Sequence, residues 1–303
     1  MKISRRDFLR ASAAIIAAPG LRPTPARALE QALAGQGNQP VIWLQGQYCT
    51  GDSVSLLNSI HYATVDQVLL NTIDLKYHAT TMAAAGDLAV SAAEGARAAG
   101  GYVLIVEGAI PTGANGTYCM VWEGMTMQNA LLTYAPNAAY ILAVGTCAAY
   151  GGIPAAAPNP TGAKSVSGIL GPSSKIINIP GCPAHPDWII GTVAHILANG
   201  QAPPLDADRR PILFFGTRIH DLCHERREHC GQQQMAGQLG EPGCLMGLGC
   251  KGPQTHADCF SRRNNAAAAG RFGVNWCIGA GSPCIGCVEP SFPDGMSPFL
   301  TGA

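Results

Sequence analysis

The number and placement of the cysteines constrain this 303-residue chain more than any other feature. It carries 12 cysteines, far more than an ordinary domain uses, and eight of them fall between Cys223 and Cys287. That second stretch is rich in glycine and weakly patterned, so it cannot bury enough apolar surface to fold unaided. Bonds to metal would supply the missing organisation, because the free energy of binding then becomes free energy of folding.

Apolar runs of strand length alternate with helical stretches from residue 40 onward. This alternation predicts an α/β fold with a flavodoxin-like, doubly wound parallel sheet whose faces are both covered by helices. The expected strands are Val41–Gln45, Ile73–Tyr77, Tyr102–Glu107, Tyr140–Val144 and Lys175–Ile179. The expected helices are Gly86–Ala99, Thr126–Tyr134 and Trp188–Asn199.

The four cysteines of the first half each come after one of these strands. Cys49 and Cys119 follow the first and third strands, and Cys147 and Cys182 follow the fourth and fifth. In open α/β sheets, ligands bind beyond the carboxyl ends of the strands. Four thiols at that edge therefore indicate one shared site. Glycine and proline next to them leave backbone amides free to approach sulfur, and such hydrogen bonds tune iron–sulfur potentials.

The first thirty residues are typical of an export address. Ser4-Arg5-Arg6-Asp7-Phe8-Leu9-Arg10 is a twin-arginine pattern, and a short Ala/Ile stretch leads to the processing site Ala26-Arg27-Ala28. We therefore expect residues 1–28 to be a twin-arginine signal peptide and residues 29–39 a linker. The protein would be periplasmic or on the exterior of the cell envelope, and cytoplasmic if the signal does not function.

Charge and composition exclude several classes of partner and reaction. The 19 basic and 19 acidic residues cancel, which removes the electrostatic footprint of a nucleic-acid or anionic-membrane binder. No run approaches the ~18 to 20 apolar residues of a membrane span, so we expect the chain to have none of its own. Only 13% of the residues are charged, which favours a large face covered by a protein partner. Phosphate loops, nucleophile elbows and paired carboxylates are lacking, so no residue is assigned a catalytic role.

Several motifs resemble those of the small subunit of nickel-iron hydrogenases. They are Cys49-Thr50-Gly51-Asp52, Val106-Glu107-Gly108, Gly145-Thr146-Cys147-Ala148 and Pro180-Gly181-Cys182-Pro183. The resemblance implies an electron-transfer subunit. A separate large subunit would hold the nickel-iron centre at which dihydrogen is split. This chain would pass the electrons through proximal, medial and distal 4Fe-4S clusters to an unknown acceptor.

The same resemblance implies the ligands of three 4Fe-4S clusters. The proximal ligands would be Cys49, Asp52, Cys147 and Cys182, the medial ligands Cys259, Cys277, Cys284 and Cys287, and the distal ligands His220, Cys223, Cys244 and Cys250. Residues 40–210 would then form the flavodoxin-like domain with the proximal cluster. Residues 211–303 would form a small, irregular cluster-binding domain with the other two. Cys230 is left over.

Two positions depart from the family pattern. Most relatives have cysteine where this chain has Asp52, and a carboxylate is a harder donor that matches iron–sulfur centres less well than thiolate. Either Asp52 ligates the fourth iron, or Cys119 replaces it. We favour Asp52, because its spacing from Cys49 presents both side chains to one site. At Cys277 relatives commonly have proline, which leaves a three-iron cluster, whereas cysteine here completes a set of four.

Three alternative interpretations follow from the same residues. His220 with three cysteines would also satisfy a tetrahedral zinc site. An even number of cysteines outside the cytosol permits a disulfide-rich exported binding protein. Neither explains four thiols at a sheet edge together with two further groups of ligands. The third alternative is an electron-transfer subunit of another respiratory complex, although the related subunits there carry one cluster and lack the second domain.

Overall fold

The computed structural model of the protein describes residues 38–59, 64–228, 235–263 and 275–300. A five-stranded parallel sheet forms the centre of the first half of the chain. Its strands lie in the order β2-β1-β3-β7-β9, which is the flavodoxin-like order and confirms the predicted fold class. The strands are β1 (Gln39–Gln45), β2 (Ile73–His78), β3 (Val103–Glu107), β7 (Tyr140–Val144) and β9 (Ile176–Ile179). Each expected strand is present within two residues of its predicted ends.

The central strands β1, β3 and β7 have continuous apolar runs because both faces of the sheet are buried, whereas the edge strand β2 carries the partly exposed Asp74 and Lys76. In β1, Val41 and Trp43 point into one apolar cluster, whereas Ile42 and Leu44 point into another on the opposite face. This alternation between two buried faces is the period of a strand, and it explains why no polar residue interrupts the middle of β1.

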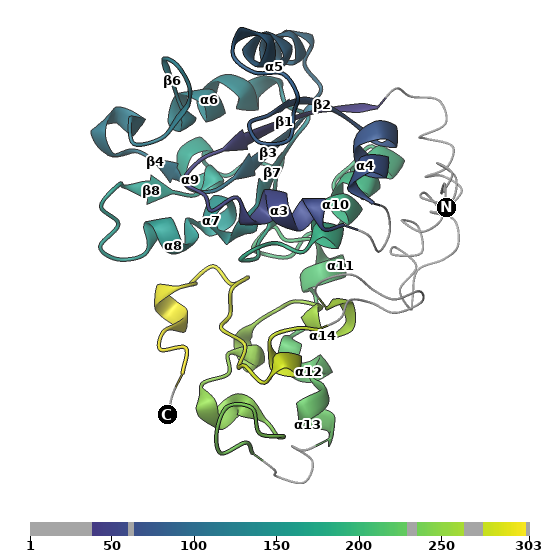
Figure 1. The fold of residues 1–303 in the computed structure, drawn as a ribbon, viewed down its shortest axis with the longest axis vertical. Helices are drawn as coiled ribbons and strands as arrows, with labels where there is room; N and C mark the ends of the chain where they lie inside the picture. Colours follow the sequence, from purple (N-terminus) through teal and green to yellow (C-terminus); the bar gives the residue numbers. More distant parts are fainter. Residues whose placement is uncertain (1–37, 60–63, 229–234, 264–274, 301–303) are drawn as a thin grey trace.

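Helices cover the two faces of the sheet, as Figure 1 shows. Residues of α3 (Gly51–Leu57), α4 (Val65–Asn71) and α10 (Pro186–Asn199) pack into the first cluster. Residues of α5 (Asp87–Ala99), α6 (Met127–Tyr134), α7 (Gly145–Tyr150) and α9 (Val166–Leu170) pack into the second. The three predicted helices are confirmed as α5, α6 and α10.

Capping explains where two of these helices begin. Thr126 precedes α6 and its hydroxyl accepts the backbone N–H of Asn129 at 3.1 Å. His185 precedes α10 and accepts the N–H of Asp187, with Pro186 in the first helical position. The smaller elements of this half are β4 (Ile110–Pro111), β5 (Met120–Trp122), β6 (Met125–Thr126), α8 (Gly152–Ala155) and β8 (Ala163–Lys164).

Beyond β9 and α10, the described residues form short helices and turns and no strand. The helices are α11 (Ile212–Phe215), α12 (Ile219–Leu222), α13 (His224–Glu228) and α14 (Cys259–Arg262). This segment, green to yellow in Figure 1, lies below the sheet. Its apolar residues, among them Leu245 and Val288, belong to the same cluster as Trp188 of α10. The second half therefore extends the core of the first.

None of the helices that the structure describes combines the length and apolar character that crossing a bilayer would require.

Candidate metal centres

Three cysteines and Asp52 lie together beyond the carboxyl ends of the strands. Cys49 lies between β1 and α3, Cys147 is in α7 directly after β7, and Cys182 follows β9. Burial, and after it the nearby charges of Cys182, Asp52 and Cys49, raise the pKa of the Cys147 thiol to about 12. Negatively charged thiolates and carboxylates raise one another's pKa only when they lie close together, so these four groups share one region. The positive charge of a metal centre would offset their mutual repulsion.

The carboxylate of Asp52 is buried within this group. Its Oδ1 accepts the backbone N–H of Ala184 at 2.7 Å. Its Oδ2 lies where a side chain at Gly145 would be, 2.1 Å from an ideally placed Cβ. Burial is the main reason that the pKa of Asp52 rises to about 7. The side chain thus lies between the loop of Cys147 and the loop of Cys182.

Glu107, at the end of β3, holds the start of α3 in place. Its carboxylate is 1% exposed, and Oε1 accepts the backbone N–H groups of Asp52 and Ser53, both at 3.1 Å. Oε2 accepts the Trp43 indole N–H at 3.0 Å and the Ser53 hydroxyl. Ser53 Oγ in turn bonds Nε2 of the buried His78 at 3.2 Å. Sequence analysis quoted Glu107 as part of a motif but did not predict this role. The indication in the sequence was a charged residue at the end of an otherwise apolar strand.

Cys119 lies in a different environment from the other three thiols. It is half-buried against the apolar cluster that includes Met127 and Tyr134, and burial raises its pKa. After burial and the charge of Glu107, the charge of Cys119 also raises the pKa of the Tyr48 phenol. The groups whose charges raise the pKa of Cys147 are Cys182, Asp52 and Cys49. The expected convergence of all four first-half thiols is therefore seen for three, with Asp52 as the fourth group.

A second group contains Cys259, Cys277, Cys284 and Cys287. The pKa of the half-buried Cys259 thiol is raised well above its usual value, first by burial and then by the charge of Cys287, with Cys284 and Cys277 adding to it. Burial also raises the pKa of Cys284 to about 12. These four residues, on α14 and on the last turns of the chain, are brought together by the fold.

A third group contains Cys223, Cys244, Cys250 and His220. Burial raises the pKa of Cys223, and the charges of Cys250 and Cys244 contribute. Gly252 lies beside both Cys250 and His220, since a Cβ there would be 3.4 Å from the sulfur of Cys250 and 3.7 Å from the backbone N of His220. Residues 229–234 lie outside the described part of the chain, and Cys230 is among them.

Backbone amides next to sulfur join neighbouring groups. The backbone amide of Cys182, in the first group, lies close to the thiol of Cys287 in the second and opposes the rise in its pKa. The backbone N–H of Cys284, in the second group, donates to Sγ of Cys250 in the third at 3.4 Å. The three groups are thus connected in series, with the cysteines of the second group between the other two.

The donor chemistry fits iron–sulfur clusters. The backbone N–H groups of Gly252 and Cys284 both donate to Sγ of Cys250 at 3.4 Å. Backbone amides also counteract the rise in the thiol pKa of four further candidate ligands: Cys147, Cys223, Cys284 and Cys287. Hydrogen bonds from backbone N–H groups to sulfur tune iron–sulfur centres. Among the described residues, no three His, Cys, Asp or Glu side chains converge as the ligands of a single metal ion would. The eleven described cysteines are all free thiols, so the disulfide alternative does not hold for them.

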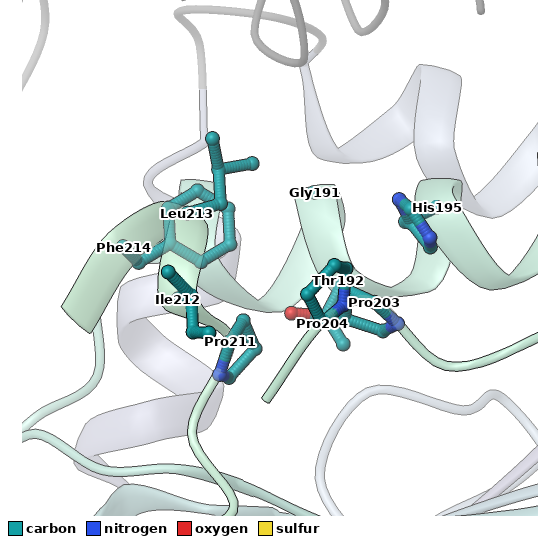
Figure 2. A pocket seen from close by; sticks show the side chains of 9 residues that line it. All are labelled: Gly191, Thr192, His195, Pro203, Pro204, Pro211, Ile212, Leu213 and Phe214. Atoms are coloured by element: carbon teal, nitrogen blue, oxygen red, sulfur yellow. The ribbon is translucent and has the colours of Figure 1, made fainter. Parts of the chain in front are cut away.

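A separate apolar cavity of about 180 Å³ lies beside α10 (Figure 2). Phe214 and Ile212 line it from α11, and Thr192 and His195 line it from α10. Burial lowers the pKa of His195. None of the candidate ligands lines this cavity, and neither a thiol nor a carboxylate does, so it lacks the donors of a metal site.

Three family models match three successive segments of the chain. Residues 2–21 match the signal sequence of the twin-arginine translocation pathway. Residues 49–196 match the family of the 20 kDa subunit of NADH ubiquinone oxidoreductase, and residues 215–300 match the C-terminal region of the NiFe/NiFeSe hydrogenase small subunit. The leader lies outside the described residues.

Individual proteins are similar over almost the full chain. The small subunit of the periplasmic [NiFeSe] hydrogenase of Desulfomicrobium baculatum is 42% identical, with 99% of each chain covered. Small subunit 1 of the periplasmic [NiFe] hydrogenase of Nitratidesulfovibrio vulgaris is 41% identical over 98% of this chain and 93% of its own length. The crystal structure of a reduced, active form of the Ni-Fe-Se hydrogenase from Desulfomicrobium baculatum aligns with a TM-score of 0.81 and 44% identity, covering 88% of this chain and 100% of that chain.

Proposed function

The chain belongs to the family of nickel-iron hydrogenase small subunits, and we propose that its three groups of ligands hold three 4Fe-4S clusters in series. It is the electron-transfer subunit of a hydrogenase and pairs with a large subunit that contains the nickel-iron centre. The twin-arginine signal directs it to the periplasm. The single observation that supports the proposal best is the serial arrangement of the groups: the amide of Cys182 lies by the thiol of Cys287, and the N–H of Cys284 donates to the sulfur of Cys250.

The proximal cluster would be bound by Cys49, Cys147, Cys182 and Asp52. Asp52 is favoured over Cys119 because its carboxylate is buried between the loops of two other ligands, whereas Cys119 packs in the apolar cluster around Met127. Such clusters supply reversible one-electron transfer. The residues of this chain contribute the ligand set and the backbone amides near it, and cover by the large subunit would complete the exclusion of water.

The medial cluster would be bound by Cys259, Cys277, Cys284 and Cys287, and we propose that it has four irons. The electrostatic effect of Cys277 on Cys259, Cys284 and Cys287 supports a shared site. A thiol at position 277 offers a fourth iron the ligand that proline could not.

The distal cluster would be bound by His220, Cys223, Cys244 and Cys250. His220 is partly exposed, whereas Cys223 and Cys244 are buried. An external acceptor would take up electrons on the side of His220. With this assignment, residues 40–210 carry the proximal cluster and residues 211–303 carry the other two, although both segments pack around one apolar cluster.

The large subunit would cover the edge of the sheet that bears the proximal ligands. Cys49 and Cys182 are exposed there in the isolated chain. Large apolar side chains in the neighbouring segments are exposed as well: Tyr48 by 40%, Val54 by 50%, Leu57 by 44% and Ile153 by 56%. A water-exposed apolar patch next to a redox centre fits a protein interface, and covering it would exclude water from the cluster.

An electron-transfer subunit of another respiratory complex is the second candidate, since residues 49–196 match such a family. That match accounts only for the segment of the proximal group. The match over residues 215–300 and the two further groups of ligands favour the hydrogenase.

Purification of the chain with its natural partner tests the proposal. We expect a complex that contains nickel in the partner and iron in this chain, with Mössbauer spectra of three 4Fe-4S clusters and no three-iron species. A colourless, iron-free protein, or a chain whose iron accounts for one cluster only, would contradict it.

A further inference from the structure

Thr146 precedes the proximal ligand Cys147 in sequence, but its hydroxyl contacts the segment of a medial ligand. The side chain is 1% exposed. Its Oγ1 donates to the backbone carbonyl of Cys287 and accepts the backbone N–H of Gly181 at 2.9 Å. The N–H of Thr146 in turn donates to the carbonyl of Gly181 at 2.9 Å. One hydroxyl therefore joins the chain segments that carry Cys147, Cys182 and Cys287.

This junction lies at the contact between two candidate clusters. Gly181 precedes Cys182, whose backbone amide lies close to the thiol of Cys287. Thr146 therefore bonds the peptide that links Gly181 to Cys182 on one side and the carbonyl of Cys287 on the other. A hydroxyl can donate and accept at once, and both functions are used here.

We propose that Thr146 is a positioning residue that sets the spacing between the proximal and medial clusters, and with it the rate of electron transfer between them. The inference rests on the proposed function. Thr146 is not a ligand, so it acts through the peptides of Cys182 and Cys287. Valine has nearly the same shape but can neither donate nor accept. With valine at position 146, the Cys287 carbonyl and the Gly181 N–H would both lose a buried hydrogen-bond partner. The segments that carry Cys182 and Cys287 would then shift apart.

Rapid freezing of the purified complex tests this inference with the wild type, Thr146→Val and Thr146→Ser. Oxidised complex is mixed with dihydrogen, and electron paramagnetic resonance follows the reduction of each cluster with time. We expect T146V to retain its iron, to reduce the proximal cluster at the wild-type rate and to reduce the medial cluster several-fold more slowly. Serine keeps the hydroxyl, so T146S should restore most of the medial rate. The magnetic interaction between the two reduced clusters should weaken in T146V only.

Thr192→Val is the matched control. Thr192 is also 1% exposed, and its hydroxyl donates to a backbone carbonyl, that of Trp188 at 2.7 Å, within α10. Its loss removes a comparable buried hydrogen bond away from the ligand segments, so the medial cluster should be reduced at the wild-type rate.

Four results would overturn the inference: medial reduction as fast in T146V as in the wild type, loss of the medial cluster from T146V, failure of T146S to restore the rate, or the same delay in T192V. Loss of the medial cluster would mean that the hydroxyl is needed for cluster binding and not for spacing. A wild-type complex without proximal or medial clusters would refute the proposed function itself, which separates the two failures.

Discussion

The carboxylate of Asp52 occupies the space that a side chain at position 145 would need. A Cβ on Gly145 would lie 2.1 Å from Oδ2, and the backbone of Gly145 has a φ of +81°, which L-residues rarely adopt. Asp52 lies on α3, and Gly145 lies two residues before Cys147 on α7. The contact therefore places the carboxylate against the loop of another candidate ligand, and it requires glycine there.

Gly145→Ala should remove the proximal cluster while leaving the other two. The added methyl group costs about 1–2 kcal/mol in backbone strain alone and also displaces the Asp52 carboxylate. Iron content and the electron paramagnetic resonance spectrum of the purified complex would report the loss. Gly124→Ala is the control, because Gly124 has a φ of +73° with no atom within 4 Å of the added Cβ. A G145A complex with an unchanged proximal signal would show that Asp52 does not need this position.

Asp52→Cys should keep the proximal cluster but move its reduction potential, because thiolate is a softer donor than carboxylate. Asp52→Asn keeps an oxygen for the Ala184 N–H but loses the anionic ligand, so it should lower the proximal iron content. A redox titration with optical and resonance spectra would measure both effects. An unchanged potential and spectrum in D52C would rule out Asp52 as a ligand.

Cys119→Ser should leave all three clusters in place. Cys119 packs in the apolar cluster of the sheet face, so the polar hydroxyl should cost about 1–3 kcal/mol of stability without removing iron. Cys147→Ser, in contrast, should remove the proximal cluster. Iron analysis of the two variants side by side decides between them. Loss of proximal iron in C119S would assign the fourth ligand to Cys119.

Cys277→Pro should convert the medial cluster into a three-iron cluster. The substitution removes the thiol next to Cys259 and Cys284, and one iron loses its protein ligand. The complex should lose one iron per chain and acquire the spin signal of an oxidised three-iron cluster. Cys277→Ser retains an oxygen donor and serves as the intermediate case. The presence of the three-iron signal in the wild type would show that Cys277 is not a ligand.

His78 should lower the stability of the protein as the pH falls from about 6.5 to about 4. Burial lowers the pKa of His78 to about 4, so the unfolded chain takes up a proton in this range that the folded protein does not. A shift of this size corresponds to roughly 3 kcal/mol at most. In its neutral form His78 bonds Ser53 through Nε2 and accepts the N–H of Thr80 through Nδ1.

His78→Gln provides the test, since glutamine does not titrate. Thermal unfolding midpoints of the complex between pH 4.5 and 7.5 should fall less steeply in the variant than in the wild type. Asp52 and Asp187 act in the opposite direction in this range, because burial raises their pKa values to about 7 and about 6, so only the difference between the two proteins isolates the histidine. Parallel pH profiles would contradict the assignment.

Local patterns were sufficient for the sheet and for much of the donor set. The predicted central strands are apolar runs with both faces buried, whereas the edge strand β2 carries the partly exposed Asp74 and Lys76. The predicted helices at 86–99, 126–134 and 188–199 are present within two residues. Short helices such as α3 and α7 were not predicted, because seven or fewer residues show too little periodicity. Asp52 lies in the first turn of α3, and Cys147 lies in the first turn of α7.

The sequence by itself determined the class of fold, the export signal and the thiol-rich chemistry, since these depend on residue types and on patterns between near neighbours. Only the tertiary structure decided which distant groups meet: Asp52 with Gly145, Thr146 with the carbonyl of Cys287, and the N–H of Cys284 with the sulfur of Cys250. The physical reason is that these contacts depend on the path of the backbone over up to 141 residues. A peptide N–H or carbonyl, moreover, is the same at every such position, so it leaves no trace in the residue types.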